Sequence, residues 1–178
     1  IGLLYGLETV SETIDDTETG KLIREIIFDE IVATIQIPGE DPKEFADQVI
    51  SRFRNPFIRH ELISISLNSI AKFKVRVLPT ILDYLRIKGH LPNKLIFALA
   101  CLIHLYLRDT DRLKDDETYL NFFESLKSDE PETLVNKVLA NSSLWDQDLT
   151  AVDGLSDLLT THFKAIASEQ MKEVLLNM

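Results

Sequence analysis

The sequence has little of several features that mark common classes of protein. Its 178 residues include one cysteine, Cys101, so no disulfide can form within the chain, and this favours a reducing compartment. The first residues, IGLLYGLETVSETIDD, lack a basic stretch followed by an apolar run, so we expect no signal peptide. The longest nearly apolar run, Leu95 to Leu107, is too short to span a bilayer and is typical of a buried core helix. These features predict a cytoplasmic protein with no membrane segment.

Glycine and histidine are also sparse. The six glycines form neither G-x-G-x-x-G nor G-x-x-x-x-G-K-[ST], so the chain has no dinucleotide or phosphate-binding fingerprint. The four histidines are scattered without the spacing of metal ligands, and we expect no metal site. We interpret Cys101, inside an apolar stretch, as a core cysteine rather than a nucleophile, and His104 as a core or rim histidine.

What the sequence does contain is helical periodicity bounded by proline and glycine. Apolar residues recur at a spacing of four, and no alternating strand pattern or internal repeat interrupts them. The pattern predicts helices over 16–36, from 42, from 56 to 79, 79–89, about 92–107, 131–140 and 154–176. The helix at 92–107 is apolar on almost every face, so we expect it at the centre of the fold. We expect the acidic segment 109–132 to be exposed to solvent and only partly helical. The predicted class is all-α, with seven or eight helices.

Positive charge is concentrated in one part of an acidic chain. The formal net charge is -10, which argues against a nucleic-acid partner. The segment from Arg52 to Arg76 nevertheless has a charge of +5, because it contains six basic residues and one acid, Glu61. The remainder of the chain therefore carries -15. A concentration of this size is typical of a small anion site.

A row of polar residues lies within that segment. His60, Ser64, Asn68, Lys72 and Arg76 recur every four residues, which would place them along one side of the predicted helix from 56 to 79. No acid stands four residues from Lys72 to neutralise it, so its ammonium group needs an anion, water or a buried carboxylate. Lysine, histidine, asparagine and arginine together suit a carboxylate or several hydroxyl groups.

Two other interpretations remain open from the residues alone. The row could simply face solvent, or the basic face could belong to a helical interaction module that binds an acidic partner. Near the C-terminal end, Trp145 and Asp148 fit packing and capping better than a functional role.

The stretch RFRNPFIRHELISISLNSIAKFKVRVLP, residues 52–79, resembles the start of the C-terminal helical domain of the mannitol dehydrogenase family, the polyol-specific long-chain dehydrogenases. The resemblance is carried by R-F-x-N-P-x-I-x-H and by a lysine twelve positions after the histidine. YGLETVSETIDD and LWDQDLTAVDGL support it, and they look most like the altronate oxidoreductase branch, also called tagaturonate reductase. The resemblance extends over nearly all of residues 1–178 and implies one helical C-terminal substrate domain of a two-domain dehydrogenase.

The resemblance also implies a reaction. An N-terminal nucleotide-binding domain, absent from this chain, would bind NAD or NADP, and a catalytic Lys-x4-Asn-x2-His motif would lie upstream of Ile1. This chain would then supply no catalytic residue and would instead cover a sugar acid. Lys72 matches a polyol-contacting lysine of the family, whereas the arginine eight positions earlier is replaced by Ser64. Anion binding would fall to Lys72, His60 and arginines such as Arg59, with Asn68 and Ser64 on the same row. The implied reaction interconverts tagaturonate and altronate, with fructuronate or mannitol reduction as alternatives.

Overall fold

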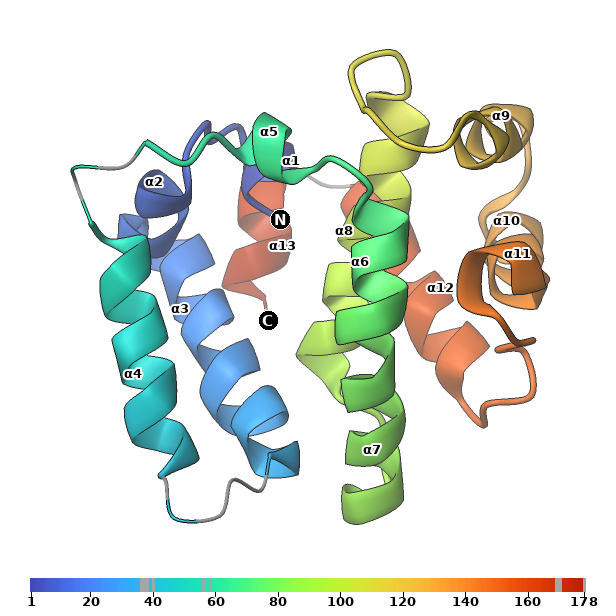
Figure 1. Cartoon of the computed structure of the whole chain (residues 1–178). Helices are drawn as coiled ribbons and strands as arrows, with labels where there is room; N and C mark the ends of the chain where they lie inside the picture. The colour runs from blue at the N-terminus through green and yellow to red at the C-terminus, as the bar shows by residue number, and fades with distance from the viewer. Residues whose placement is uncertain (36–38, 40, 56, 58, 169–170, 178) are drawn as a thin grey trace.

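The computed structural model describes residues 1–178 except 36–38, 40, 56, 58, 169–170 and 178 (Figure 1). The α-helices, in chain order, are α1 (Gly2–Tyr5), α2 (Val10–Asp15), α3 (Thr17–Glu25), α4 (Pro42–Phe53), α5 (Leu62–Ile65), α6 (Ser69–Arg76), α7 (Leu78–Lys88), α8 (Asn93–Arg108), α9 (Glu117–Ser125), α10 (Pro131–Ala140), α11 (Ser142–Trp145), α12 (Leu155–Ser168) and α13 (Met171–Leu176). A π-helix, η1 (Ile26–Ile31), and a 3-10 helix, η2 (Val32–Thr34), continue α3. Eight α-helices contain eight or more residues, and the described residues pair as a sheet only at one isolated bridge. The predicted all-α class is confirmed, whereas the described residues form thirteen α-helices rather than the seven or eight expected, because the sequence pattern does not predict the short helices and longer ones are divided.

Helix α8 lies in the core of the molecule, as its apolar sequence predicts. Nine of its sixteen residues are buried, more than in any other described helix. It packs along α12, which in turn packs on α10, and η1 contacts α8 as well. In Figure 1, α3 and α4 stand side by side on one flank, and α9, α10 and α11 gather on the opposite flank. The central position of α8 follows from an apolar surface that leaves no face suited to water.

Several helices begin and end where their capping residues predict. The carboxylate of Asp16 accepts the backbone N–H groups of Glu18 at 3.0 Å and Thr19 at 2.9 Å, and so satisfies free donors at the start of α3. Asp41 caps α4 in the same way. Helix α7 is followed by Gly89, whose φ of 75° is the left-handed conformation that glycine adopts without strain.

The acidic stretch 109–132 contains α9 and the first two residues of α10, and so is partly helical, as predicted. Phe123 and Leu126 anchor it in the core, with 0% and 2% of their surfaces exposed. Among the described residues, none of the helices has both the length and the apolar character needed to cross a membrane.

Three predicted helices differ from the structure. The helix predicted over 16–36 is an α-helix only as far as Glu25 and continues as η1 and η2 to Thr34. Residues 154–176 form α12 and α13 rather than one helix. The predicted helix from Pro56 to Pro79 is divided into α5, α6 and the beginning of α7. Pro56 itself lies outside the described residues, but Arg59 and His60 are not helical. The physical cause of this division lies at Asn68, in the candidate site.

Candidate functional site

The predicted row of polar side chains is not carried by one helix. His60 precedes α5, Ser64 lies on α5, and Lys72 and Arg76 lie on α6. Asn68, between α5 and α6, has φ 53° and ψ 44°, a left-handed conformation that interrupts the helix. This corrects the prediction of a continuous helix. We call residues 62–76 the site segment.

Side-chain hydroxyls and one distant carbonyl stabilise the interruption. Ser66 Oγ donates to the Ile63 carbonyl at 2.6 Å, and Ser69 Oγ donates to the Ser66 carbonyl at 2.7 Å. The backbone N–H of Asn68 donates to the Lys114 carbonyl at 2.9 Å. Serine and asparagine compete with helical hydrogen bonds, and asparagine enters the left-handed region more readily than most residues. These polar contacts prevail over the helical periodicity of the apolar residues around them.

The chain just before the site segment is held against the N-terminal part of the molecule. The N–H of Leu62 donates to the Glu8 carbonyl at 2.8 Å, and the N–H of Val10 donates to the His60 carbonyl at 3.0 Å. These bonds accompany the isolated antiparallel bridge. The exposed side chain of His60 therefore lies beside the connection between α1 and α2.

Lys72 lies one turn into α6 and reaches back across the interruption. Its ammonium group donates to the carbonyl of Ile65, the last residue of α5, at 2.8 Å. None of the ion pairs formed between described residues includes Lys72, whose side chain is half-buried. An ammonium group has three N–H donors, so two remain for a ligand. This geometry suits the binding of a carboxylate or of hydroxyl oxygens at the surface of the site segment.

Tertiary ion pairs account for much of the positive charge between residues 52 and 76. The pairs with acids outside this range are Arg54 with Asp15 at 3.0 Å, Arg59 with Glu8 at 3.1 Å, and Lys74 with Asp146 at 2.9 Å. Arg59 also lies 3.6 Å from Glu61. The hydrogen bond from Lys74 to Asp146 raises the pKa of the lysine. Arg59, predicted to bind an anion, is thus engaged by two carboxylates of the chain itself.

Trp145 and Asp148 have the structural roles that the sequence favours. Trp145 is buried, its Nε1 donates to the Val138 carbonyl at 2.7 Å, and its ring meets Phe73 edge-on with centroids 6.2 Å apart. Asp148 accepts the backbone N–H of Thr150 at 2.9 Å. Trp145 therefore packs against Phe73 on the buried face of α6.

Cys101 and His104 belong to the core and its rim, as predicted. Cys101 is 1% exposed, and burial raises the pKa of its thiol to about 11, far from the range of a reactive thiolate. His104 Nε2 donates to the Phe163 carbonyl at 2.9 Å, and the two rings stack with centroids 4.0 Å apart. Burial lowers the pKa of His104. Within the ranges that the structure describes, no group of three His, Cys, Asp or Glu side chains is placed to hold a metal ion.

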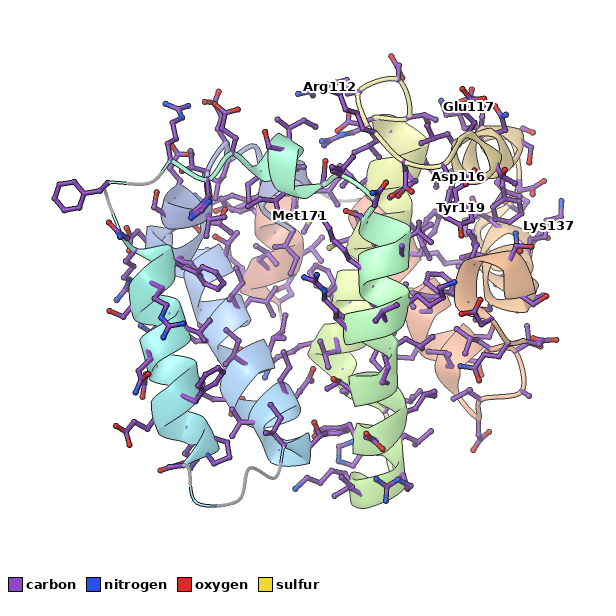
Figure 2. All side chains as sticks on the ribbon, in the orientation of Figure 1. Arg112, Asp116, Glu117, Tyr119, Lys137 and Met171 are labelled. Atoms are coloured by element: carbon purple, nitrogen blue, oxygen red, sulfur yellow. The ribbon has the colours of Figure 1, made fainter. Side chains whose placement is uncertain are left out.

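Two cavities lie near the N-terminal end of the chain. One, of about 360 Å³, is lined by the α1–α2 connection, by Arg59 and by the arginines Arg108 and Arg112. The other, of about 650 Å³, lies between α8, α12 and α13 and includes Met171, labelled in Figure 2. Of the five predicted site residues, Arg59 alone lines either of these cavities; the other four lie outside both.

Sequence reasoning does not single out Tyr106 and Asp115, although both contact the site segment. The N–H of Ile70, in the first turn of α6, lies 3.3 Å from the Tyr106 hydroxyl oxygen and 3.3 Å from Asp115 Oδ2. A tyrosine in an otherwise apolar helix is the available signal, because its buried hydroxyl needs a partner. The identity of that partner depends on tertiary structure.

Comparison with known proteins assigns the fold to a family. Residues 1–167 match the model of the mannitol dehydrogenase C-terminal domain. The chain belongs to this family. The resemblance inferred from residues 52–79 is thereby confirmed.

Curated relatives point to one branch of this family. A protein of Yersinia pestis named altronate oxidoreductase is 39% identical over 97% of this chain and 38% of its own length. A Bacillus subtilis protein of the same name is 38% identical over 98% of this chain and 36% of its own length. The chain thus spans little more than a third of the relatives that it matches.

Solved structures agree with the fold. Pseudomonas fluorescens mannitol 2-dehydrogenase, in a ternary complex with NAD and D-mannitol, superposes with a TM-score of 0.85 at 19% identity, over 99% of this chain and 36% of that one. A substrate-free D-sorbitol dehydrogenase gives a TM-score of 0.78 at 23% identity, over 98% of this chain and 36% of that one. At this level of identity the likeness concerns the helical fold.

Proposed function

We propose that residues 1–178 form the substrate-covering C-terminal domain of an NAD-dependent oxidoreductase that interconverts tagaturonate and altronate in hexuronate catabolism. The observation that carries the proposal is the 38–39% identity, along 97–98% of the chain, with proteins named altronate oxidoreductase. A cytoplasmic location fits the single cysteine of the sequence.

In this proposal the site segment binds the sugar acid. Lys72 holds the carboxylate or a hydroxyl group with the two donors that its bond to Ile65 leaves available. Asn68 and Ser64 are exposed on the same segment and supply an amide and a hydroxyl group, and His60 borders them. Arg59 contributes positive potential more than direct contact, because Glu8 and Glu61 already engage it. Such contacts orient the substrate, which by itself lowers a reaction barrier by several kcal/mol.

The residues of this chain do not suit a nucleotide-binding site. The regular structure among the described residues is helical apart from one isolated bridge, and the sequence has no glycine-rich strand-to-helix turn, so we place NAD on an N-terminal nucleotide-binding domain of the same protein. The nicotinamide, when bound there, would supply the hydride chemistry. The Lys-x4-Asn-x2-His motif expected upstream of Ile1 would supply the acid-base group.

The ion pairs weaken the alternative of a module that binds an acidic partner. Three of the six basic residues between 52 and 76 are paired with acids from elsewhere in the chain. The remaining charge is too small for a broad basic face. Fructuronate and mannitol reduction stay within the family and are outcomes of the test below.

The test uses the complete protein that contains this chain, assayed with tagaturonate, fructuronate and fructose. Lys72→Met removes the charge and keeps most of the stem. Loss of a charge-assisted hydrogen bond costs about 1.5–3 kcal/mol, so we expect kcat/KM for tagaturonate to fall roughly ten- to a hundredfold. The KM for NADH should change much less, and the neutral ketose should be affected less than the sugar acid.

Lys74→Met is the matched control. It removes the same charge two residues away, where Lys74 pairs with Asp146 instead of the substrate. We expect it to leave kcat/KM near that of the wild type. Equal losses in both variants would contradict a substrate role for Lys72, and a preference for fructuronate or fructose would reassign the substrate within the family.

A further inference from the structure

A pair of polar side chains, a buried tyrosine and a half-buried aspartate, contacts the site segment and is not used by the proposed chemistry. Tyr106, on α8, is 0% exposed, and its hydroxyl group donates to Asp115 Oδ2. Burial and the neighbouring Asp115 carboxylate raise the pKa of Tyr106, so it stays protonated as a donor. Its ring is fixed against Phe123, with centroids 4.9 Å apart. Ring packing and the hydrogen bond thus hold the Tyr106 side chain in place.

The pair binds the backbone at the interruption of the site segment. Ile70 N–H lies 3.3 Å from both the Tyr106 hydroxyl oxygen and Asp115 Oδ2, and Asn68 N–H donates to the Lys114 carbonyl at 2.9 Å. Two consecutive residues of the α8–α9 loop thus bind the two N–H groups that flank Ser69, the first residue of α6. Figure 2 labels Asp116 and Glu117 where this loop enters α9.

Helix α6 needs such partners from outside. The first N–H groups of a helix have no acceptor within the helix, and the side chain of Asn68, the residue before α6, caps none of them. Asp115 takes over this role from 45 residues along the chain, and its negative charge also complements the positive end of the helix dipole. Next to this cap, the Lys114 carbonyl binds the N–H of Asn68, whose backbone is left-handed.

Resting on the proposed function, we propose that Asp115 and Tyr106 are positioning residues for the substrate: they fix the junction between α5 and α6 and thereby the placement of Lys72. The backbone N–H of Lys72 donates to the Asn68 carbonyl at 3.1 Å, and its ammonium group reaches the Ile65 carbonyl on the far side of the junction. A shift of the junction therefore moves the ammonium group. Neither Asp115 nor Tyr106 is hydrogen-bonded to the side chain of Lys72, so they act through the backbone.

The test compares Asp115→Ala with Asp116→Ala in the complete protein. Asp116 is the adjacent carboxylate, but it accepts the Thr118 N–H of α9 at 2.8 Å and does not touch α6. A misplacement of about 1 Å can cost up to a hundredfold, so we expect Asp115→Ala to lower kcat/KM for tagaturonate by roughly ten- to a hundredfold. The KM for NADH should be unchanged, and Asp116→Ala should behave as the wild type.

Two further variants separate positioning from general loss of structure. Asp115→Asn keeps an oxygen that accepts the Ile70 N–H, so it should recover most of the activity. In a Lys72→Met background, Asp115→Ala should add little, because the group that it positions has already been removed. Multiplicative effects of the two substitutions, or an Asp115→Asn variant as impaired as Asp115→Ala, would overturn the proposal.

Hydrogen exchange gives a readout that does not depend on the substrate. In the complete protein, Asp115→Ala should speed exchange of the amides around Asn68 and Ile70, and Asp116→Ala should not. If Lys72→Met leaves activity intact while exchange behaves as expected, the proposed substrate role of Lys72 fails but the structural link stands. Unchanged exchange at Ile70 would overturn the positioning role itself.

Discussion

Helix α8 and the site segment touch at Tyr106 and Ile70, yet they are held in place by different forces. Helix α8 is a continuous helix of sixteen residues, nine of them buried. The site segment is interrupted at its middle, and it leaves Ile65, Leu67 and Val75 exposed at 45%, 45% and 69%. Apolar packing along most of its length fixes α8, which a distant carboxylate caps only in its first turn, whereas polar groups of the α8–α9 loop hold the backbone in the middle of the site segment.

This difference implies a division of labour. Changes in α8 remove buried apolar surface, so they should lower the free energy of unfolding. Changes at the junction of the site segment alter a few hydrogen bonds and little apolar packing, so they should change the geometry of the site more than the stability of the domain. The predictions below test this division, in order of decreasing effect on stability.

The largest effect is expected from Phe97→Ala in α8. Phe97 is 0% exposed, and truncation of a buried phenylalanine costs about 3–5 kcal/mol because it leaves a cavity. Urea unfolding of the chain would measure the loss. The matched control is Val75→Ala in the site segment, where a 69% exposed apolar side chain should change stability by less than about 0.5 kcal/mol. Similar losses in the two variants would refute the comparison.

The same comparison explains how far the sequence predicts the fold. Helix α8 and the ends of α4 and α7 follow from local patterns, because their apolar periodicity, prolines and glycines act within a few residues. The interruption at Asn68 does not follow from such patterns. It depends on Lys114 and Asp115, which only the folded chain brings near, and the apolar residues around Asn68 keep a helical spacing through it.

The candidate site is predicted from the sequence in the same partial way. The charge of residues 52–76 draws attention to Lys72, whose ammonium group binds a backbone carbonyl and whose substrate role stays a prediction. The same charge overstates Arg54 and Arg59, since their partners Asp15 and Glu8 lie far away in the sequence. Net charge along a chain cannot distinguish cations that await a ligand from cations that are already paired in the fold.

An intermediate effect is expected at Glu30, which caps α8 from a distance much as Asp115 caps α6. Glu30 is 5% exposed, and its carboxylate accepts the backbone N–H groups of Lys94 at 2.8 Å and Leu95 at 2.7 Å. Glu30→Gln keeps one acceptor and places an NH₂ group against the other N–H. We expect a loss of about 1–3 kcal/mol in unfolding free energy at neutral pH, with no change in kcat/KM of the folded enzyme.

The pH dependence sharpens the test at Glu30. Burial raises the pKa of Glu30 in the folded protein, despite the two N–H groups that lower it. A raised folded pKa means that the folded state holds the proton more tightly, so this contribution is complete below the unfolded pKa and is lost as pH rises through the folded pKa. The stability of the wild type relative to Glu30→Gln should therefore fall as pH rises from the ordinary pKa of glutamate. A difference that is constant across this range, or that increases with pH, would contradict the assignment.

The smallest effect on stability is expected at Asn68, where the backbone is left-handed with φ 53°. Glycine adopts this conformation freely, whereas alanine is strained in it by about 1–2 kcal/mol, so Asn68→Ala should be less stable than Asn68→Gly by roughly that amount.

Both Asn68 variants lack the amide group. If that amide contacts the sugar acid, both should lose kcat/KM for tagaturonate to a similar degree despite their different stabilities. If Asn68 serves only to turn the chain, Asn68→Gly should retain the activity of the wild type and Asn68→Ala alone should lose it. The pair thus separates the backbone role of Asn68, seen in the structure, from the binding role proposed for its side chain.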